Sequence, residues 1–339
     1  MKYIIKYLLS KVYCFVYLFW KFLLKLNIIY QKKFNTKIVS IGNISIGGTG
    51  KTPMIETISK ELTKNNISHC IVSKGYKKKI KGTVIVSNQQ EIISSIEQSG
   101  DEPFMLAHSL KNIPIIVGDK SQSIEIAIKK FKPQLILLDD GFQSLKIKRD
   151  CDIVLVDLSR EFNYYKLLPL GFLREPISSL KRASLIIFTK SNKSIIESEK
   201  IKNLVLKNIN NSVKVYNSNL EEQIKRYDFE KQCFINDTID VKNSFVACAG
   251  LANNHLFKNM IEEKYPTNNI FYLYPDHHNY NAQDIIDIKE SLKQINSKIL
   301  VTTKKDFYKL YHEFKDYHIY ILDVKHDIQN KSEIIDFIK

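Results

Sequence analysis

One glycine-rich stretch limits what this chain can fold into more than any other part of it. We call it the phosphate loop, and its members are Ser45, Ile46, Gly47, Gly48, Thr49, Gly50, Lys51 and Thr52. The apolar run 37–41 predicts a strand before it, and the spacing across 53–62 predicts a helix after it. Glycines let backbone N–H groups approach phosphate oxygens, and the helix N-terminus adds a favourable dipole. We expect Lys51 to reach the β- and γ-phosphates and the Thr52 hydroxyl to bind Mg²⁺.

A second candidate lies at the end of another apolar run. Residues 135–138 are Leu-Ile-Leu-Leu, and Asp139 and Asp140 follow them. In enzymes with a phosphate loop, a carboxylate at the C-terminal end of such a strand can hold Mg²⁺ or its water. Spacing does not decide between the two carboxylates, so both are candidate metal ligands.

Asp101 has two interpretations. Residues 100–103 (Gly-Asp-Glu-Pro) precede a helical run over 104–110. Asp101 can be a helix N-cap that accepts backbone N–H bonds, because Asp is favoured there and Pro suits the first turn. It can also be a base, or a group that positions a hydroxyl, facing the γ-phosphate. Sequence spacing leaves both open.

Two adjacent histidines, His277 and His278, follow the apolar run 271–274. No cluster of Cys or carboxylates with metal-ligand spacing accompanies them, so zinc is not predicted. A histidine that orients or tunes a carboxylate is chemically sensible, because its charge changes near neutral pH.

Residues 1–30 predict an amphipathic helix with lysines on one half and apolar residues on the other. The lysines are Lys2, Lys6, Lys11, Lys21 and Lys25, and the apolar half holds Ile4, Leu8, Val12, Phe15, Phe19, Phe22, Leu23 and Leu26. The longest charge-free run, 12–20, is shorter than the about 20 apolar residues that span a bilayer. The segment has no small-residue cleavage site, so a secretory signal is not predicted. We expect the helix to lie in the interface of an anionic membrane. The alternative is a terminal helix whose apolar face packs on the protein core.

The formal net charge of +15 also indicates an anionic partner, which can be nucleic acid, an acidic membrane or a phosphorylated substrate. Aromatic residues are not interleaved with basic ones in a recognisable RNA- or DNA-binding motif, so no nucleic acid is predicted. The five cysteines are scattered and form no CxxC pair, which indicates a reducing compartment and no disulfide framework.

The remaining pattern predicts a P-loop NTPase-like α/β domain with a mostly parallel sheet and helices on both faces. Its strands are expected at 37–42, 69–74, 83–87, 113–117, 135–139, 152–156 and 184–189, and helices at 53–65, 101–111 and 121–131. Residues 190–235 are polar with weak periodicity. A second, smaller α/β domain is expected to follow, with strands near 244–249, 269–273, 298–302 and 318–323. We therefore predict domains at 36–200 and 205–339, after the membrane-associating helix at 1–30.

Several motifs together resemble the tetraacyldisaccharide 4′-kinase (lipid A 4′-kinase) family, and they keep the family's order along the chain. They are Gly-Asn-Ile-Ser-Ile-Gly-Gly-Thr-Gly-Lys-Thr-Pro (42–53), Ser-Lys-Gly-Tyr (73–76), Gly-Asp-Glu-Pro (100–103), Asp-Asp-Gly-Phe-Gln (139–143), Leu-Pro-Leu-Gly-Phe-Leu-Arg-Glu-Pro (168–176) and Pro-Asp-His-His (275–278). Strict phosphate loops have glycine where Ser45 stands, but serine is usual there in this family.

The resemblance implies a membrane-associated enzyme of two α/β domains with ATP in the cleft between them. It would use ATP and Mg²⁺ to phosphorylate the 4′-hydroxyl of a tetraacylated glucosamine disaccharide 1-phosphate in lipid A biosynthesis. The expected location is the cytoplasmic face of the inner membrane, held peripherally by the N-terminal helix. The expected partners are this lipid and the anionic membrane surface; no protein partner is predicted.

By motif match, the resemblance implies that Lys51, Asp101 and His277 are catalytic, with His277 as the partner of Asp101. It places a further set of residues in or near the cleft: Tyr76, Gln143, Arg174 and Glu175. Two positions depart from the family. Lys74 stands where Arg is usual, which loses a bidentate fork, and Ser144 stands where His is usual, so we assign Ser144 no acid–base role.

Two other functions fit parts of the sequence less well. Membrane-tethered regulatory P-loop ATPases without a lipid substrate share the Gly-Gly-Thr-Gly-Lys-Thr run, but they carry Lys where this chain has Ile46. A GTPase could use residues 303–306 (Thr-Lys-Lys-Asp) for base recognition. That run lies in the second predicted domain, no switch-like region is evident, and we interpret it as an accident of a strand end.

Overall fold

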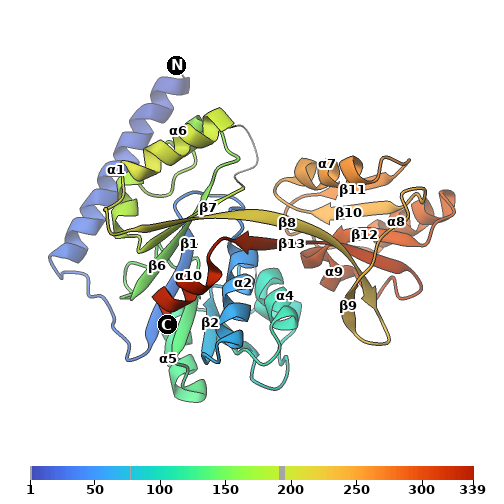
Figure 1. The fold of residues 1–339 in the computed structure, drawn as a ribbon, viewed down its shortest axis with the longest axis horizontal. Helices are drawn as coiled ribbons and strands as arrows, with labels where there is room; N and C mark the ends of the chain where they lie inside the picture. Colours follow the sequence, from blue (N-terminus) through green and yellow to red (C-terminus); the bar gives the residue numbers. More distant parts are fainter. Residues whose placement is uncertain (1, 77, 191–194) are drawn as a thin grey trace. The chain divides into compact units, whose positions relative to one another are not determined.

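The computed structural model describes residues 2–76, 78–190 and 195–339, and the chain forms two compact units. The first unit comprises Met1–Leu220 and Lys325–Lys339, and the second comprises Glu221–Val324. Each is an α/β structure in its own right (Figure 1).

The sheet of the first unit is mostly parallel. Its strands follow the order β8-β7-β6-β1-β5-β2-β4-β3; the pairings from β8 to β4 are parallel, and β3 pairs antiparallel with β4. The bounds are β1 Lys37–Asn43, β2 His69–Ser73, β3 Val84–Ser87, β4 Ile115–Val117, β5 Leu135–Asp139, β6 Cys151–Asp157, β7 Leu185–Thr189 and β8 Lys214–Asp228. The strands expected between residues 37 and 189 are all present, because runs of Ile, Leu and Val buried on both faces are typical of parallel strands.

Helices cover both faces of this sheet. Their bounds are α1 Lys2–Lys25, α2 Lys51–Lys64, α3 Ile96–Ser99, α4 Asp101–Ser109, α5 Lys120–Phe131, α6 Ile195–Leu206 and α10 Lys331–Ile338, with 3₁₀ turns η1 Phe162–Tyr165 and η2 Ile177–Arg182. On one face, Met54 and Ile58 of α2 pack with Val39 and Ile41 of β1. On the other face, α5 packs against residues of β1, β2, β4 and β5, and α6 packs against residues of β6 and β7.

The second unit repeats this design on a smaller scale. Its parallel strands have the order β11-β10-β12-β13, and β9 pairs antiparallel with the end of β8. The bounds are β9 Cys233–Asn236, β10 Val246–Gly250, β11 Ile270–Tyr274, β12 Ile299–Thr303, β13 His318–Ile328, α7 Asn254–Lys264, α8 Ala282–Gln294 and α9 Lys304–Leu310. Separate apolar clusters lie under α7 and under α8 with α9.

Two long strands carry the chain between the units, and the sequence indicated only part of them. β8 begins in the first unit and passes into the second after Leu220, and β13 returns to the first unit after Val324. The polar stretch 190–235 contains α6 and β8. Buried positions in β8 are few and irregular, so the strand lacks the period-two pattern by which strands are recognised.

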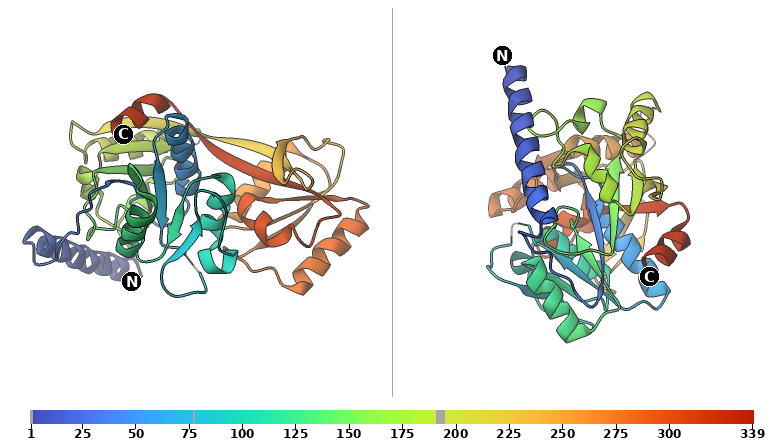
Figure 2. Two further views of the ribbon diagram at one scale, coloured as in Figure 1. Left: turned by 90° about the horizontal axis from the view of Figure 1, so that it is seen from below. Right: turned by 90° about the vertical axis from the view of Figure 1, so that its left-hand side faces the viewer.

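The C-terminal residues belong to the first unit, whereas the sequence assigned 205–339 to the second domain. Ile334, Ile335 and Ile338 of α10 are buried in the same apolar cluster as α2 (Figure 2). The predicted boundary, between residues 200 and 205, precedes the first crossing of the chain, after Leu220, and the prediction did not include the return of the chain after Val324. A chain reversal of this kind depends on contacts across hundreds of residues, which local patterns do not report.

Helix α1 belongs to the first unit (Figures 1 and 2) and contacts it through side chains that include Ser10 and Tyr17. Most of its apolar half is exposed, as are four of its five lysines. Ser10 is buried against the unit, and Tyr17 and Lys21 are half-buried. The exposed apolar side chains include Ile4, Leu8, Val12, Phe15, Phe19, Phe22 and Leu26. The structure therefore contradicts the alternative in which the apolar half packs on the core. Among the described residues, α1 is also the one helix long and apolar enough to cross a membrane by length and composition.

The packing of α10 predicts a stability difference between two neighbouring substitutions. Ile335→Ala should lower the free energy of unfolding by about 2–5 kcal/mol, because it removes buried methyl groups and leaves a cavity. Asp336→Ala, on the exposed side of the same helix, should change it by less than about 0.5 kcal/mol. Urea unfolding measures both, and equal losses would contradict the packing of α10 against α2.

Candidate active site around the phosphate loop

The phosphate loop begins at the C-terminal end of β1, which lies between β5 and β6 in the sheet. Gly47 and Gly50 adopt φ values of 101° and 87°. Glycine reaches this left-handed region without strain, which explains the residue type at both positions. Gly50 is the N-cap of α2, so Lys51 and Thr52 form its first turn.

Side chains from three other segments hold the carbonyl groups of this loop. The donors and their acceptors are the Tyr164 hydroxyl to Ile46 O, Lys190 Nζ to Gly48 O at 3.0 Å, and His326 Nε2 to Gly50 O at 2.9 Å. A peptide's carbonyl and N–H point in opposite directions. In the described part of the chain, no hydrogen bond engages the N–H groups from Gly47 to Thr52. Unpaired N–H groups at a helix N-terminus form a site for an anion.

Asp139, the last residue of β5, and Asp140, which follows it, lie in opposite electrostatic surroundings. Asp139 is buried and accepts a hydrogen bond from the Ser73 hydroxyl at 2.7 Å. Burial, then the negative charge of Glu102, raises the pKa of Asp139 to about 6. Burial also tends to raise the pKa of Asp140, but the hydrogen bonds and charge of Arg174 and the charge of Lys51 outweigh it and hold that pKa well below its usual range.

Glu102 is a site residue that the sequence analysis did not single out. The Thr52 hydroxyl donates to Glu102 Oε2 at 2.8 Å, and the charge of Glu102 acts on Asp139. Thr52, Glu102 and Asp139 therefore gather beside the first turn of α2. The sequence signal was the second carboxylate of the Gly-Asp-Glu-Pro motif, since neighbouring helical residues point about 100° apart.

Asp101 is the first residue of α4 rather than its N-cap. The N-cap is Gly100, whose φ is 87°, and no side chain caps this helix end. A Cβ on Gly100 would lie 2.8 Å from the carbonyl oxygen of Tyr76, and one on Gly75 would lie 2.9 Å from that of Ser99. The two motifs that contain these glycines therefore pack backbone against backbone. This contact brings Tyr76, itself exposed, next to the start of α4.

Arg174 and Asp140 form a bidentate ion pair, with distances of 2.9 and 2.8 Å. Lys51 Nζ lies 3.7 Å from the same carboxylate. Arg174 also donates to the Asn43 side chain at the end of β1. The structure thus brings together Lys51, Asp140 and Arg174, which come from three separate motifs.

Glu175 is fully buried and anchors this arrangement from behind. Its carboxylate accepts hydrogen bonds from Gln143 at 2.8 Å, Arg182 at 2.8 Å and Tyr17 of α1 at 2.6 Å. Gln143 also donates to the carbonyl of Asn43 at 2.9 Å. Glu175 therefore positions Gln143, and its own oxygens are already engaged within the protein.

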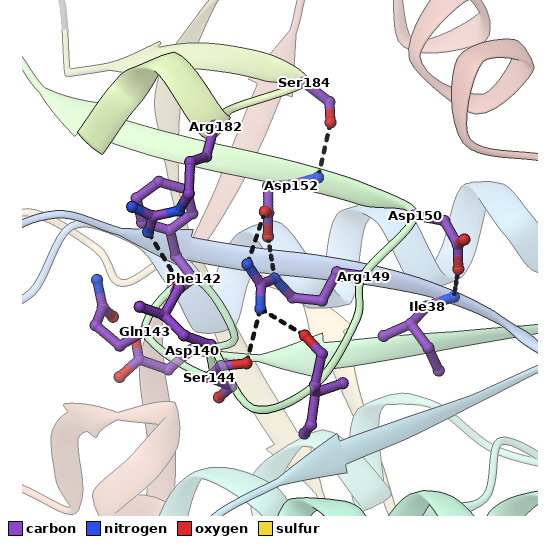
Figure 3. Close-up of polar contacts among 12 residues, drawn as sticks. Ile38, Asp140, Phe142, Gln143, Ser144, Arg149, Asp150, Asp152, Arg182 and Ser184 are labelled. Carbon is purple, nitrogen blue, oxygen red and sulfur yellow. Dashed lines mark hydrogen bonds and ion pairs between the residues drawn. The ribbon is translucent and has the colours of Figure 1, made fainter. Parts of the chain in front are cut away.

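The turn that follows β5 is itself tethered (Figure 3). Arg149 forms an ion pair with Asp152 and donates to the carbonyls of Ser144 and Ile147. The Arg182 guanidinium lies over the Phe142 ring, 4.3 Å from its centroid. These contacts hold the segment between Asp140 and the next strand in one conformation.

His277 belongs to the second unit, unlike the other predicted site residues. It has a φ of 59°, and its N–H donates to the Gly250 carbonyl at 3.3 Å. The neighbouring Asp276 pairs with Lys305 at 2.8 Å. The loop that carries His277 is thus held by its backbone and by an adjacent ion pair.

Residues 303–306 lie where β12 passes into α9, and they have a structural role there. Thr303 caps α9, and its hydroxyl donates to Asp306 Oδ2 at 2.7 Å. The same carboxylate oxygen accepts the Gly250 N–H at 2.9 Å, and Asp306 is fully buried. An aspartate engaged in this way supports the loop next to His277 and does not suit recognition of a nucleotide base.

A phosphate loop follows an inner strand of a parallel sheet, and two carboxylates lie at the end of the neighbouring strand, β5. This geometry defines a nucleotide-binding α/β protein of the P-loop class. Comparison with known families narrows the class. The family described as tetraacyldisaccharide-1-P 4′-kinase matches residues 3–339. The chain belongs to this family, and the regulatory ATPase is not favoured.

Individual relatives agree with this assignment. A tetraacyldisaccharide 4′-kinase of Flavobacterium psychrophilum is 33% identical over 319 residues, which cover 93% of this chain and 89% of the relative. One of Halothermothrix orenii is 29% identical over 350 residues, covering 98% and 90%. The crystal structure of LpxK from Aquifex aeolicus in complex with ATP has a TM-score of 0.79 at 24% identity and covers 100% of this chain and 98% of that one, so the fold is shared.

The raised pKa of Asp139 predicts a pH-dependent stability. A protonated Asp139 stabilises the folded state fully below its ordinary pKa of 3.8, and this contribution is lost as pH rises through about 6. Asp139→Asn keeps a neutral group at every pH. Without Mg²⁺ and nucleotide, we expect the free energy of unfolding of this variant at pH 8 to exceed that of the wild type by on the order of 3 kcal/mol, so that it unfolds at a higher temperature. The difference should fade toward pH 4.

Thermal unfolding across this pH range measures the effect, with Asp336→Asn as the control. Asp336 is an exposed carboxylate paired with Lys339, so its replacement should have little effect at either pH. An Asp139→Asn variant that is less stable than the wild type at pH 8 would contradict this account of the buried carboxylate.

Proposed function

We propose that this protein transfers the γ-phosphoryl group of ATP to the 4′-hydroxyl of a tetraacylated glucosamine disaccharide 1-phosphate, a precursor of lipid A. The observation that carries the proposal is the phosphate loop in a chain of the tetraacyldisaccharide-1-P 4′-kinase family. Its carbonyls at Ile46, Gly48 and Gly50 accept side-chain hydrogen bonds, and its N–H groups from Gly47 to Thr52 have no partner among the described residues. Phosphoryl transfer needs little covalent help from a protein, and catalysis is mostly positioning and charge neutralisation.

The N–H groups from Gly47 to Thr52 and the Lys51 ammonium bind the phosphates of ATP in this proposal. Lys51 lies 3.7 Å from Asp140, which holds the ammonium near the loop. Arg174 holds Asp140 in turn through two hydrogen bonds. Asp140 therefore serves as an anchor for Lys51 and Arg174 in this account, although the sequence left it open as a metal ligand.

The residues beside the first turn of α2 fit Mg²⁺. Glu102 is close enough to Asp139 for its negative charge to raise the pKa of Asp139, and a divalent cation offsets such repulsion. Mg²⁺ prefers oxygen ligands and commonly takes one or two carboxylates together with substrate phosphates. We assign the metal to Thr52 and Asp139, with Glu102 as the acceptor for the Thr52 hydroxyl. When bound, the ion would neutralise charge on the β- and γ-phosphates.

Asp101 aligns the acceptor hydroxyl and removes its proton in this proposal, and His277 supports it. Gly100 is the N-cap of α4, so Asp101 is not required to cap that helix. His277 is held by a backbone hydrogen bond and a left-handed φ, which fixes the direction of its side chain. Because the two residues belong to different units, their partnership is a functional proposal, to be tested by substitution.

The acceptor is a lipid, and α1 suits it. Each buried CH₂ of an acyl chain contributes about 0.8 kcal/mol to membrane attachment, so the substrate does not leave a bilayer readily. The exposed apolar half of α1 would lie in the interface of an anionic membrane at the cytoplasmic face of the inner membrane. Tyr13 and Tyr17 of α1 hydrogen-bond to Arg174 and Glu175, so the same helix contacts the segment next to the site.

Activity measurements test the proposal directly. Labelled ATP, Mg²⁺ and tetraacyldisaccharide 1-phosphate should yield a bis-phosphorylated lipid. Lys51→Ala and Asp101→Ala should each lower the rate by about 10²–10⁴-fold. Lys64→Ala, on the exposed surface of the same helix as Lys51, should leave the rate unchanged. Wild-type protein that hydrolyses ATP without labelling the lipid would refute the substrate assignment.

A double substitution tests the partnership of Asp101 and His277. If they act as one unit, the Asp101→Ala, His277→Ala variant should be about as slow as Asp101→Ala alone. Multiplicative losses would show independent roles. An Asp101→Ala variant with near-normal activity and a lower unfolding temperature would assign Asp101 to helix stability alone.

Membrane binding tests the role of α1. Phe15→Asp and Phe19→Asp should each weaken binding to vesicles containing anionic lipid by about tenfold or more, because burial of an aromatic side chain contributes about 1.5–3 kcal/mol. Co-sedimentation measures this, and the unfolding temperature should not change. Ile196→Asp on α6 is the control, since Ile196 is 71% exposed and Phe15 is 70% exposed. Unchanged vesicle binding of both α1 variants would contradict the proposal.

A further inference from the structure

His326 of β13 is buried beside the phosphate loop and makes a hydrogen bond with each ring nitrogen. Its Nε2 donates to the Gly50 carbonyl at 2.9 Å, and the Ser218 hydroxyl of β8 lies 2.8 Å from its Nδ1. Gly50 and His326 are 276 positions apart in sequence, and the sequence analysis did not consider His326. A carbonyl oxygen can only accept, so Nε2 carries the proton of the bond to Gly50. The Ser218 hydroxyl lies closer to Nδ1 than to its other acceptor, the Asn219 carbonyl at 3.3 Å. When this hydroxyl donates to Nδ1, His326 is a neutral donor to Gly50.

The chemical state of the imidazole agrees with this pattern. Burial lowers the pKa of His326 to about 4, with the nearby charge of Lys190 acting in the same direction and the bond to Gly50 opposing them. At neutral pH the ring is uncharged. The interaction with Gly50 is thus a single directed hydrogen bond between neutral groups.

That hydrogen bond fixes the peptide between Gly50 and Lys51. The peptide is planar, so a carbonyl held toward His326 turns the Lys51 N–H to the opposite side. Gly50 has a φ of 87°, and a Cβ at this position would lie 2.6 Å from His326 Nε2. The close approach therefore needs glycine on one side and a flat ring with a terminal donor on the other.

The contact also lies next to both chain crossings. His326 comes one residue after the return of β13 to the first unit at Lys325, and Ser218 comes two residues before β8 leaves at Leu220. The two strands that carry the chain between the units therefore meet the phosphate loop through Ser218 and His326.

We propose that His326 is a positioning residue for the nucleotide: it holds the Gly50 carbonyl so that the Lys51 N–H and the first turn of α2 face the phosphates. This inference rests on the proposed ATP site and adds a residue to it. The aligned Lys51 N–H contacts phosphate both before and during transfer. Loss of the hydrogen bond from His326 to Gly50 should therefore raise the Kd and KM for ATP and leave kcat and the KM for the lipid almost unchanged.

A pair of amide substitutions separates the hydrogen bond from the volume of the side chain. The amide nitrogen of Gln reaches the position of Nε2, whereas the shorter Asn reaches only that of Nδ1. His326→Asn should raise the Kd for magnesium-ATP about tenfold, as expected for the loss of one positioning hydrogen bond. His326→Gln should stay within about threefold of the wild type. Calorimetric titration without lipid measures both values.

His69 provides a matched control in the same unit. It is buried, burial lowers its pKa, and its Nε2 lies 2.7 Å from the Ser59 hydroxyl, but it is at the start of β2, at the other end of the strands from the phosphate loop. His69→Asn should lower the unfolding temperature and leave the Kd for ATP unchanged. Equal Kd changes in His69→Asn and His326→Asn would overturn the proposal, because a general loss of stability would then explain both.

Two further outcomes would also overturn it: wild-type ATP affinity in His326→Asn, or no recovery of affinity in His326→Gln. The proposed function fails in a different way. Wild-type protein that binds no ATP refutes the nucleotide site itself. A wild type that binds ATP and does not label the lipid refutes only the substrate, and the difference between the Asn and Gln variants would still support the role of His326.

Discussion

The rest of the site depends on the direction in which the peptides of the phosphate loop face. Glycine has more conformational freedom than any other residue, so an unanchored glycine-rich loop would lose much entropy on binding a phosphate. Here the donors of Tyr164, Lys190 and His326 hold alternate carbonyls and set the N–H groups in advance. These donors come from η1, from the end of β7 and from β13. The anion site therefore exists only when the first unit is folded around it.

The same side chains that dock α1 also order the candidate site. Tyr17 donates to Glu175, Glu175 accepts from Gln143, and Gln143 holds the backbone at the end of β1. Tyr13 donates to the carbonyl of Arg174. The Tyr13 and Tyr17 hydroxyls of α1 thus contact the segment that supplies Arg174, while most of the apolar half of the helix stays exposed. A helix oriented in this way can bind a membrane without giving up its contacts with the enzyme, which a helix packed by its apolar face could not do.

Local patterns predicted much of the fold and part of the site. The parallel strands and the phosphate loop were predictable because apolar runs and glycine spacing are local signals. The polar strand β8 and the return of α10 to the first unit were not, because each is set by contacts that distant residues provide. The same holds for site residues: Lys51 and Thr52 are part of a motif, whereas Lys190 and His326 carry no motif of their own and act only through the loop they touch.

Asp139 and Asp140 show why the last step of prediction needs the structure. They are adjacent and chemically identical, and the sequence offered no reason to separate them. Asp139 is buried at the end of β5, near the negative charge of Glu102. Both effects disfavour its ionised form until a cation is near. Asp140 has turned into a left-handed conformation, where Arg174 binds both of its oxygens. One carboxylate is thereby suited to a metal and the other to holding cationic side chains, and only partners distant in sequence make that difference.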